Sequence, residues 1–121
     1  MTFTGKTKNL GVIGYPIAHS FSPAMHNAAL SAAGLDYAYI AMPVAQEELE
    51  NAVKGIKALN FRGINVTIPH KQAIMEYLDE INEDAKIIGA VNTVVNDNGR
   101  LTGYNTDVIG FIDALKNAGF E

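Results

Sequence analysis

The sequence predicts an α/β fold, a three-layer αβα sandwich built on a mixed, mostly parallel sheet. Short apolar runs typical of buried strands alternate with longer amphipathic stretches typical of helices, which favours a parallel sheet with helices on both faces. Near the C-terminus, Asp97-Asn98-Gly99 joins two strand-like runs. Asn-Gly at such a turn indicates a β-hairpin, so one strand is expected to run antiparallel.

The first third of the chain predicts a strand, a helix and a second strand. Leu10–Gly14 is a short apolar run that reads as a buried strand. A helix is expected to follow, with Ser22 as its N-cap and Pro23 at its first position, and to end near Gly34. Tyr37–Met42 has the composition of the second strand.

The middle of the chain predicts a helix, a strand and a short helix. From Gln46, apolar residues recur at helical spacing on one face: Leu49, Ala52, Val53 and Ile56. Phe61–Ile68 alternates as a strand, with Asn65 and Thr67 on one face and Ile64, Val66 and Ile68 on the other. Pro69 ends that strand, and a short helix is expected over His70–Leu78.

The last third predicts a helix, the hairpin and a final helix. The helix is expected over Asn82–Ile88, and the hairpin strands over Ala90–Asn96 and Arg100–Tyr104. Asp107 can cap a last helix ending near Gly119. Its apolar stripe comprises Val108, Phe111, Ile112 and Leu115.

The composition describes one ordinary domain over residues 1–121. The chain is 48% hydrophobic and 18% charged, with a net charge of −4 and no cysteine. Without a basic stripe, a nucleic-acid partner is not expected. The absence of cysteine excludes disulfides and thiolate metal sites, and His19, His26 and His70 lack the spacing of a metal-binding pair. No apolar run approaches a membrane span and no signal peptide is recognisable, so we expect a cytoplasmic protein without membrane contact.

Two clusters of polar residues follow predicted strands, where ligands bind in open α/β sheets. Ser20 and Ser22 precede a helix N-terminus, which suits a carboxylate or phosphate, although they also read simply as a loop residue and a cap. Asn65 and Thr67 offer neutral donors and acceptors for hydroxyl groups, and Lys71 could exchange a proton with a carbonyl or alcohol. The plain alternative is a polar sheet face beside a solvated lysine.

Two further clusters, residues 89–93 and 103–107, contain Asn92 and Asp107. Asn92 stands among apolar strand residues, so a buried carboxamide there needs hydrogen-bond partners. Asp107 reads as a helix cap unless it lies near Lys71, where it could orient the lysine and assist proton transfer.

Taken together, four motifs in order resemble the N-terminal, substrate-binding domain of shikimate dehydrogenases, over about Leu10 to Gly119. The motifs are G-Y-P-I-x-H-S-x-S-P-x-x-H-N, N-V-T-x-P-x-K, G-A-V-N-T and G-x-N-T-D. The resemblance implies the reduction of 3-dehydroshikimate to shikimate with NADP as cofactor, in the pathway to aromatic amino acids. The cofactor would deliver hydride to C3 while the Lys71 side supplies the proton.

The resemblance also implies a role for each matching residue. Ser20 and Ser22 would hold the substrate carboxylate, and Asn65, Thr67 and Asn92 the ring hydroxyls, while Lys71 and Asp107 would be the catalytic pair at the C3 oxygen. Tyr39 stands where some quinate-using relatives place a substrate contact, and Glu83 where some members carry an acidic residue assigned to the cofactor.

One departure from the family is that no dinucleotide fingerprint occurs in the 121 residues. We therefore expect the Rossmann cofactor domain of the family to be absent from this chain, and the chain alone to show no turnover. Two alternatives stay open, a quinate/shikimate dehydrogenase domain and a non-catalytic binding module for a shikimate-like acid. A homodimer is also expected, and NAD stays open beside NADP as the cofactor.

Overall fold

A computed structural model describes residues 2–107. These residues form a six-stranded sheet in the order β2-β1-β3-β5-β6-β4. Its strands are β1 (Lys8–Gly14), β2 (Tyr37–Pro43), β3 (Gly63–Val66), β4 (Glu80–Ile81), β5 (Thr93–Asp97) and β6 (Arg100–Tyr104). Pairs β1–β2, β1–β3 and β4–β6 are parallel, whereas β3–β5 and β5–β6 are antiparallel.

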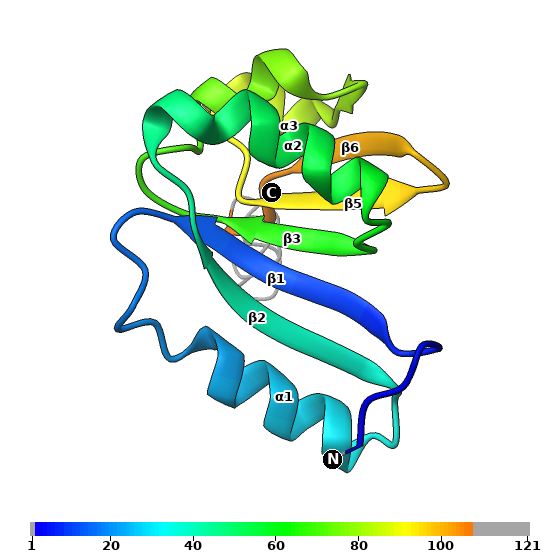
Figure 1. Ribbon diagram of the computed structural model, residues 1–121. Helices are drawn as coiled ribbons and strands as arrows, with labels where there is room; N and C mark the ends of the chain where they lie inside the picture. The colour runs from blue at the N-terminus through cyan, green and yellow to red at the C-terminus, as the bar shows by residue number, and fades with distance from the viewer. Residues whose placement is uncertain (1, 108–121) are drawn as a thin grey trace, which may run out of the picture.

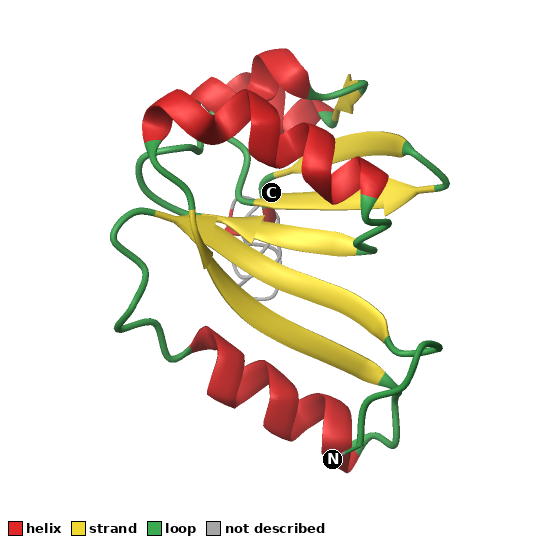
Figure 2. Ribbon diagram, viewed as in Figure 1, coloured by secondary structure: helices red, strands yellow, loops and turns green. Residues whose placement is uncertain are grey.

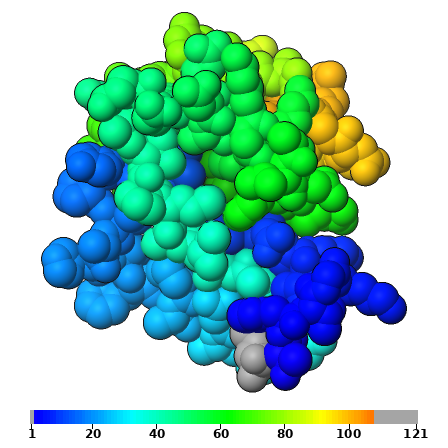
Figure 3. Space-filling view, viewed as in Figure 1, coloured from blue at the N-terminus to red at the C-terminus, as the bar shows by residue number. Residues whose placement is uncertain are grey.

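Helices cover both faces of the sheet, as Figures 1 and 2 show. Helix α1 (Ser22–Ala32) lies against the β1–β2 end on one face, and α2 (Leu49–Ala58) and α3 (Glu83–Ile88) lie on the other. The space-filling view shows the blue-to-cyan residues of α1 on one side and the green residues near α2 on the other (Figure 3). Two short 3₁₀ helices complete the described part: η1 (Gln46–Glu48) and η2 (Ala73–Tyr77). The predicted α/β class and mixed sheet are confirmed.

The main hydrophobic core lies between the sheet and α2. Ile13 of β1 is completely buried there, beside its register partner Val66 of β3, and Leu101 of β6 belongs to the same core. Helix α2 contributes the buried residues Leu49, Val53 and Ile56, which are three of the four residues in the predicted stripe. The amphipathic pattern therefore identified the correct face of this helix.

Helix α1 covers a smaller cluster and contains no fully buried residue. Val12, Ile17 and Tyr39 form this cluster, with Leu30 of α1 packed against it. A side chain on α1 also reaches the edge strand: Asn27 Nδ2 donates to the Tyr39 carbonyl at 2.8 Å, and its Oδ1 accepts from the Tyr39 N–H at 2.9 Å. Asn27 thus pairs with β2 as a neighbouring strand would.

The expected cap of α1 is wrong by one residue. Phe21 is the N-cap and already has a helical backbone, and Ser22 and Pro23 are the first two helical residues. Ser20 Oγ accepts the Ser22 N–H at 3.2 Å, so a side-chain turn begins before the helix and moves the boundary. The C-terminal prediction is confirmed, because Gly34 follows the helix with φ +70°.

The strand predicted over Phe61–Ile68 is shorter, and Ile68 does not share the buried face of Val66. Strand β3 ends at Val66, and the chain turns where the His70 N–H bonds the Thr67 carbonyl at 3.0 Å. Ile68 is consequently 72% exposed. The helix predicted over His70–Leu78 is reduced to η2, because the Lys71 carbonyl accepts the Val91 N–H at 2.8 Å.

The hairpin is confirmed, with Asn98 and Gly99 at positive φ in its turn. Its first strand begins at Thr93 rather than Ala90. Residues 90 and 91 belong to the connection before β5, where the Val91 N–H bonds the Lys71 carbonyl. Strand β4 was not predicted, because two residues carry no periodicity. The prediction of Asp107 as the cap of the last helix is wrong, because Thr106 and Asp107 are both already helical. The predicted residues Val108, Phe111, Ile112, Leu115 and Gly119 lie outside the described residues. No helix between residues 2 and 107 is long and apolar enough to cross a membrane.

Candidate functional site

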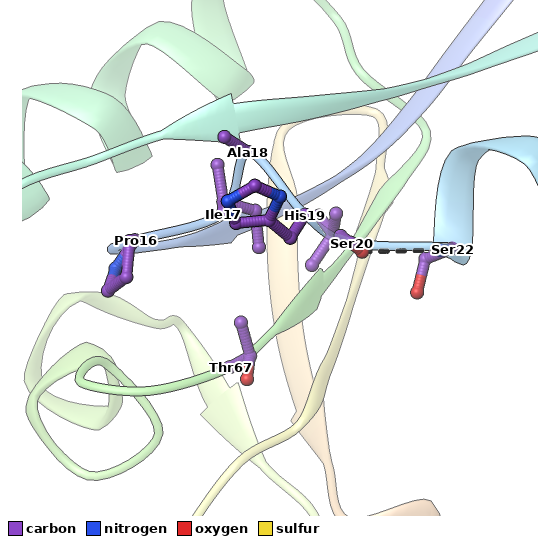
Figure 4. A pocket seen from close by; sticks show the side chains of 8 residues that line it. Pro16, Ile17, Ala18, His19, Ser20, Ser22 and Thr67 are labelled. Atoms are coloured by element: carbon purple, nitrogen blue, oxygen red, sulfur yellow. Dashed lines mark hydrogen bonds between the residues drawn. The ribbon is translucent and has the colours of Figure 1, made fainter.

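A pocket of about 290 Å³ opens at the carboxyl ends of β1 and β3. Ser20 and Ser22 line it from the loop before α1, and Thr67 lines it from the end of β3. Figure 4 shows Thr67 opposite the loop that carries the two serines, whose hydrogen bond is drawn as a dashed line. The structure therefore brings Thr67 together with the two predicted serines, which lie more than forty residues earlier in the sequence.

Gly14 allows the two sides of this pocket to approach. A Cβ atom on Gly14 would overlap the Thr67 methyl group and would lie 3.1 Å from Ile17 Cδ1 and 3.2 Å from the Ile68 carbonyl. Thr67 consequently packs directly on the end of β1. The position of its hydroxyl depends on the absence of a side chain at residue 14.

The serine side of the pocket suits an anion. Ser22 is the first residue of the 11-residue helix α1, whose first turn contains no acidic residue. The positive end of the helix dipole is therefore not neutralised by the protein. A carboxylate placed there could accept hydrogen bonds from hydroxyl groups and from helix N–H groups.

A second set of predicted residues is joined by hydrogen bonds across the sheet. The Tyr39 hydroxyl donates to Asn65 Oδ1 at 2.7 Å, and Asn65 Nδ2 donates to Thr93 Oγ1 at 3.3 Å. Thr93 Oγ1 donates to Asn92 Oδ1 at 3.0 Å. Tyr39, Asn65 and Thr93 also line a second pocket, of about 260 Å³.

Tyr39 is held rigidly in this set. Its ring stacks on His26 with the centroids 4.3 Å apart, and Asn27 binds its backbone. Burial raises the pKa of the Tyr39 hydroxyl to about 12, so the hydroxyl keeps its proton and remains a donor to Asn65 at neutral pH.

Lys71 is half-buried and lies on a loop that is fixed on both sides. Before it, the completely buried His70 donates from Nε2 to the Val44 carbonyl at the end of β2. The Lys71 carbonyl itself accepts the Val91 N–H. Its backbone is therefore positioned by the core rather than by its charge.

Lys71 and Asp107 do not contact each other in this structure. Both lie among the described residues, and neither belongs to an ion pair within residues 2–107. Asp107 is exposed and follows Thr106, whose N–H and hydroxyl both bond Asn92 Oδ1, at 3.0 and 3.2 Å. Glu83 is the exposed first residue of α3 and bonds Lys86, so it does not line either of these pockets.

A comparison with protein families identifies the family of the chain. The family model described as the shikimate dehydrogenase substrate binding domain matches residues 12–94. The chain belongs to this family. The predicted family resemblance is therefore confirmed.

Known proteins similar to the chain include shikimate dehydrogenases. The shikimate dehydrogenase (NADP(+)) of Carboxydothermus hydrogenoformans is 53% identical over 100% of this chain and 43% of its own length. That of Methanococcus maripaludis strain C7 is 62% identical over 87% of this chain and 38% of its own length. The structure of shikimate 5-dehydrogenase from Listeria monocytogenes, in complex with shikimate and NAD, has a TM-score of 0.91 and 50% identity, covering all of this chain and 42% of that one.

The chain thus spans about two fifths of the length of the relatives that it matches. Residues 2–107 do not fit a dinucleotide. The β1–α1 connection, where such a fold has a glycine-rich phosphate loop, contains Pro16 and no G-x-G-x-x-G pattern. Within residues 2–107 no group of three His, Asp or Glu side chains could hold a metal ion.

Thr93 and Thr106 were not among the site residues predicted from the sequence. Both carry side chains that bond Asn92. Thr93 lies next to Asn92 in the motif G-A-V-N-T, and Thr106 lies next to Asp107 in the motif G-x-N-T-D. The available signal was the requirement that a half-buried carboxamide have partners, and hydroxyl groups beside it could have met that requirement.

Proposed function

We propose that this chain is the substrate-binding part of an NADP-dependent shikimate dehydrogenase, which interconverts 3-dehydroshikimate and shikimate. The observation that carries the proposal is the pocket where Ser20, Ser22 and Thr67 meet at the N-terminus of α1. One end of this pocket suits a carboxylate and the other suits a hydroxyl group. The complex of the Listeria monocytogenes relative with shikimate supports the same ligand.

In this proposal Ser20 and Ser22 hold the substrate carboxylate, and Asn65, Thr67 and Asn92 bind the ring hydroxyls. Tyr39 contributes through its hydrogen bond to Asn65.

Lys71 would donate a proton to the C3 oxygen during reduction, and Asp107 would contact the same oxygen. Lys71 and Asp107 are not ion-paired with each other, so we propose that each side chain contacts the C3 oxygen separately.

The hydride would come from NADP, whose glycine-rich phosphate-binding pattern does not occur among the described residues. We therefore propose that turnover requires a cofactor-binding part beyond this chain, and that the 121-residue chain alone is inactive. A contact of Glu83 with the cofactor, a cytoplasmic location and a homodimer remain predictions.

The test is a titration of the ¹⁵N-labelled chain with shikimate, followed by amide shifts, with NADP in a separate titration. We expect shikimate to shift residues around Ser22, Asn65 and Asn92, and NADP to shift few. Ser22→Ala should weaken shikimate binding but leave binding of shikimate methyl ester nearly unchanged. Ser31→Ala, at an exposed serine in the last turn of α1, is the matched control.

The alternatives predict different results. Preferential binding of quinate would support a quinate/shikimate dehydrogenase domain. A reading frame that continues past Glu121 into a glycine-rich strand–turn–helix would rule out a separate, non-catalytic binding module. If neither acid shifts any residue at millimolar concentration, the proposed function of this chain is wrong.

A further inference from the structure

A directional chain of hydrogen bonds crosses the sheet beside the proposed substrate pocket. It begins at Tyr39 on β2, passes over β1 to Asn65 on β3, and continues through Thr93 on β5 to Asn92. Thr106, which follows β6, meets it at Asn92 from the other side. Five residues from distant parts of the sequence thus form one network.

A single backbone group fixes the direction of every bond in this network. The Thr106 N–H can only donate, so the Asn92 atom that it meets at 3.0 Å must be the carboxamide oxygen. That oxygen can only accept, so the Thr93 hydroxyl must donate to it. Because the Thr93 hydroxyl donates its only proton in that bond, it must accept the hydrogen bond from Asn65 Nδ2.

The same reasoning fixes the Asn65 carboxamide. Since its Nδ2 faces Thr93, its Oδ1 faces Tyr39, and the Tyr39 hydroxyl must donate. The orientation of both asparagines therefore follows from one N–H group and one threonine hydroxyl.

Asn92 can offer a ligand only the N–H donors of its Nδ2 group. Its Oδ1 accepts three donors, from Thr93 Oγ1 and from the N–H and hydroxyl of Thr106. Within residues 2–107, its Nδ2 has no protein acceptor. A ligand group that meets this side chain must therefore accept a hydrogen bond.

We infer that Thr93 and Thr106 are positioning residues that turn Asn92 so that it presents only N–H donors, which selects an oxygen acceptor on the ligand. The inference rests on the proposed function for the identity of that ligand, and assigns one ring hydroxyl of shikimate as an acceptor at Asn92. Thr93 is the central residue, because it is bonded to both asparagines. Without its hydroxyl, Asn65 loses the bond that fixes its orientation, and Asn92 keeps only its two bonds to Thr106.

The first experiment measures the network without a ligand. ¹⁵N relaxation of the side-chain NH₂ groups of Asn65 and Asn92 is compared in the wild-type 121-residue chain and in Thr93→Val. We expect rigid NH₂ groups in the wild type. Thr93→Val keeps the shape of the side chain and removes its hydroxyl, so it should make the Asn65 NH₂ group mobile and reduce the rigidity of the Asn92 NH₂ group, which keeps its bonds to Thr106. Thr93→Ser, which restores the hydroxyl, should restore the rigidity.

Thr102→Val is the matched control. Thr102 lies on the neighbouring strand β6 opposite Val95, is half-buried, and makes no side-chain hydrogen bond within the described residues. It therefore repeats the chemical change outside the network. If Thr93→Val leaves both NH₂ groups as rigid as Thr102→Val does, the inferred positioning role is wrong.

The second experiment measures ligand selection with shikimate and analogues that each lack one ring hydroxyl. We expect Thr93→Val to weaken shikimate binding by about tenfold, as the loss of correctly oriented hydrogen bonds implies. The affinity difference between shikimate and one particular deoxy analogue should disappear in this variant and return in Thr93→Ser. An equal loss for all ligands would contradict selection through Asn92.

The two proposals fail in different ways. If the wild-type chain binds neither shikimate nor its analogues, the proposed function fails, and the NH₂ relaxation still decides whether Thr93 positions the asparagines. If the wild type binds shikimate and Thr93→Val binds it equally well, the proposed function stands and the inference is overturned.

Discussion

Replacing Gly14 by alanine should damage the substrate pocket through one identifiable contact. The added Cβ would overlap Thr67 Cγ2, and it would lie 3.1 Å from Ile17 Cδ1 and 3.2 Å from the Ile68 carbonyl. Thr67 cannot stay in place, because its methyl group and the new Cβ would occupy the same space. We expect a loss of about 1–3 kcal/mol in the free energy of unfolding, as for other overpacked sites.

The same displacement should weaken shikimate binding more than tenfold, because the Thr67 hydroxyl moves with its methyl group. Urea unfolding measures the first effect and the ¹⁵N titration the second. Thr67→Ser removes the overlapping methyl group and keeps the hydroxyl, so it should recover most of both losses when combined with Gly14→Ala.

Gly55→Ala controls for the change of residue type, since a Cβ at Gly55 in α2 meets no atom within 4 Å. This substitution should stabilise the chain by about 0.5–1 kcal/mol, as expected for alanine in a helix. The steric reasoning is refuted if Gly14→Ala binds shikimate normally, or if Thr67→Ser fails to recover binding.

Three further outcomes follow from the contacts. Asn27→Ala should lower the free energy of unfolding by about 1–3 kcal/mol, since two hydrogen bonds to the edge strand are lost, as urea unfolding would show. Ile13→Ala should cost about 2–5 kcal/mol by the same assay, whereas Ile87→Ala, at a side chain 80% exposed, should change it by less than about 0.5 kcal/mol. The raised pKa of Tyr39, about 12 in the folded chain against 10.0 for the free group, means that ionisation favours unfolding. Its contribution is complete below pH 10 and is lost as the pH rises towards 12, so Tyr39→Phe should show a smaller decline in unfolding free energy over that range.

The fold was largely predictable because most elements carry a strong local signal. The stripe on α2, the turn residues Asn98 and Gly99, and the end of α1 before Gly34 all depend on neighbouring residues alone. Strand β4 depends on pairing with β6. The start of β5 depends on the bond between the Val91 N–H and the Lys71 carbonyl. Such non-local bonds leave no periodic pattern, so the sequence could not reveal them.

In the candidate site, too, one part was predictable from the sequence and another part was not. Ser22 and Thr67 could be placed at one edge of the sheet, because both follow parallel strands. The orientation of Asn92 could not be predicted, since it depends on hydroxyl groups from two other segments, at Thr93 and Thr106. Spacing indicates which residues can meet, but only the folded backbone determines which atom of a carboxamide faces the ligand.

The loops that carry the site are tied to one another before any ligand arrives. The Val44 N–H bonds the Gly14 carbonyl at 3.0 Å, and the Tyr15 N–H bonds the Ile68 carbonyl at 3.0 Å. The buried side chain of His70 adds a third bond between these loops, because its Nε2 donates to the Val44 carbonyl. These bonds join the ends of β1, β2 and β3, and they use backbone groups and one core histidine rather than any residue proposed to touch the substrate. Serine, threonine and lysine side chains can therefore keep their mutual placement without contacting each other, so that the ordering cost of assembling the site is met by folding and not by binding.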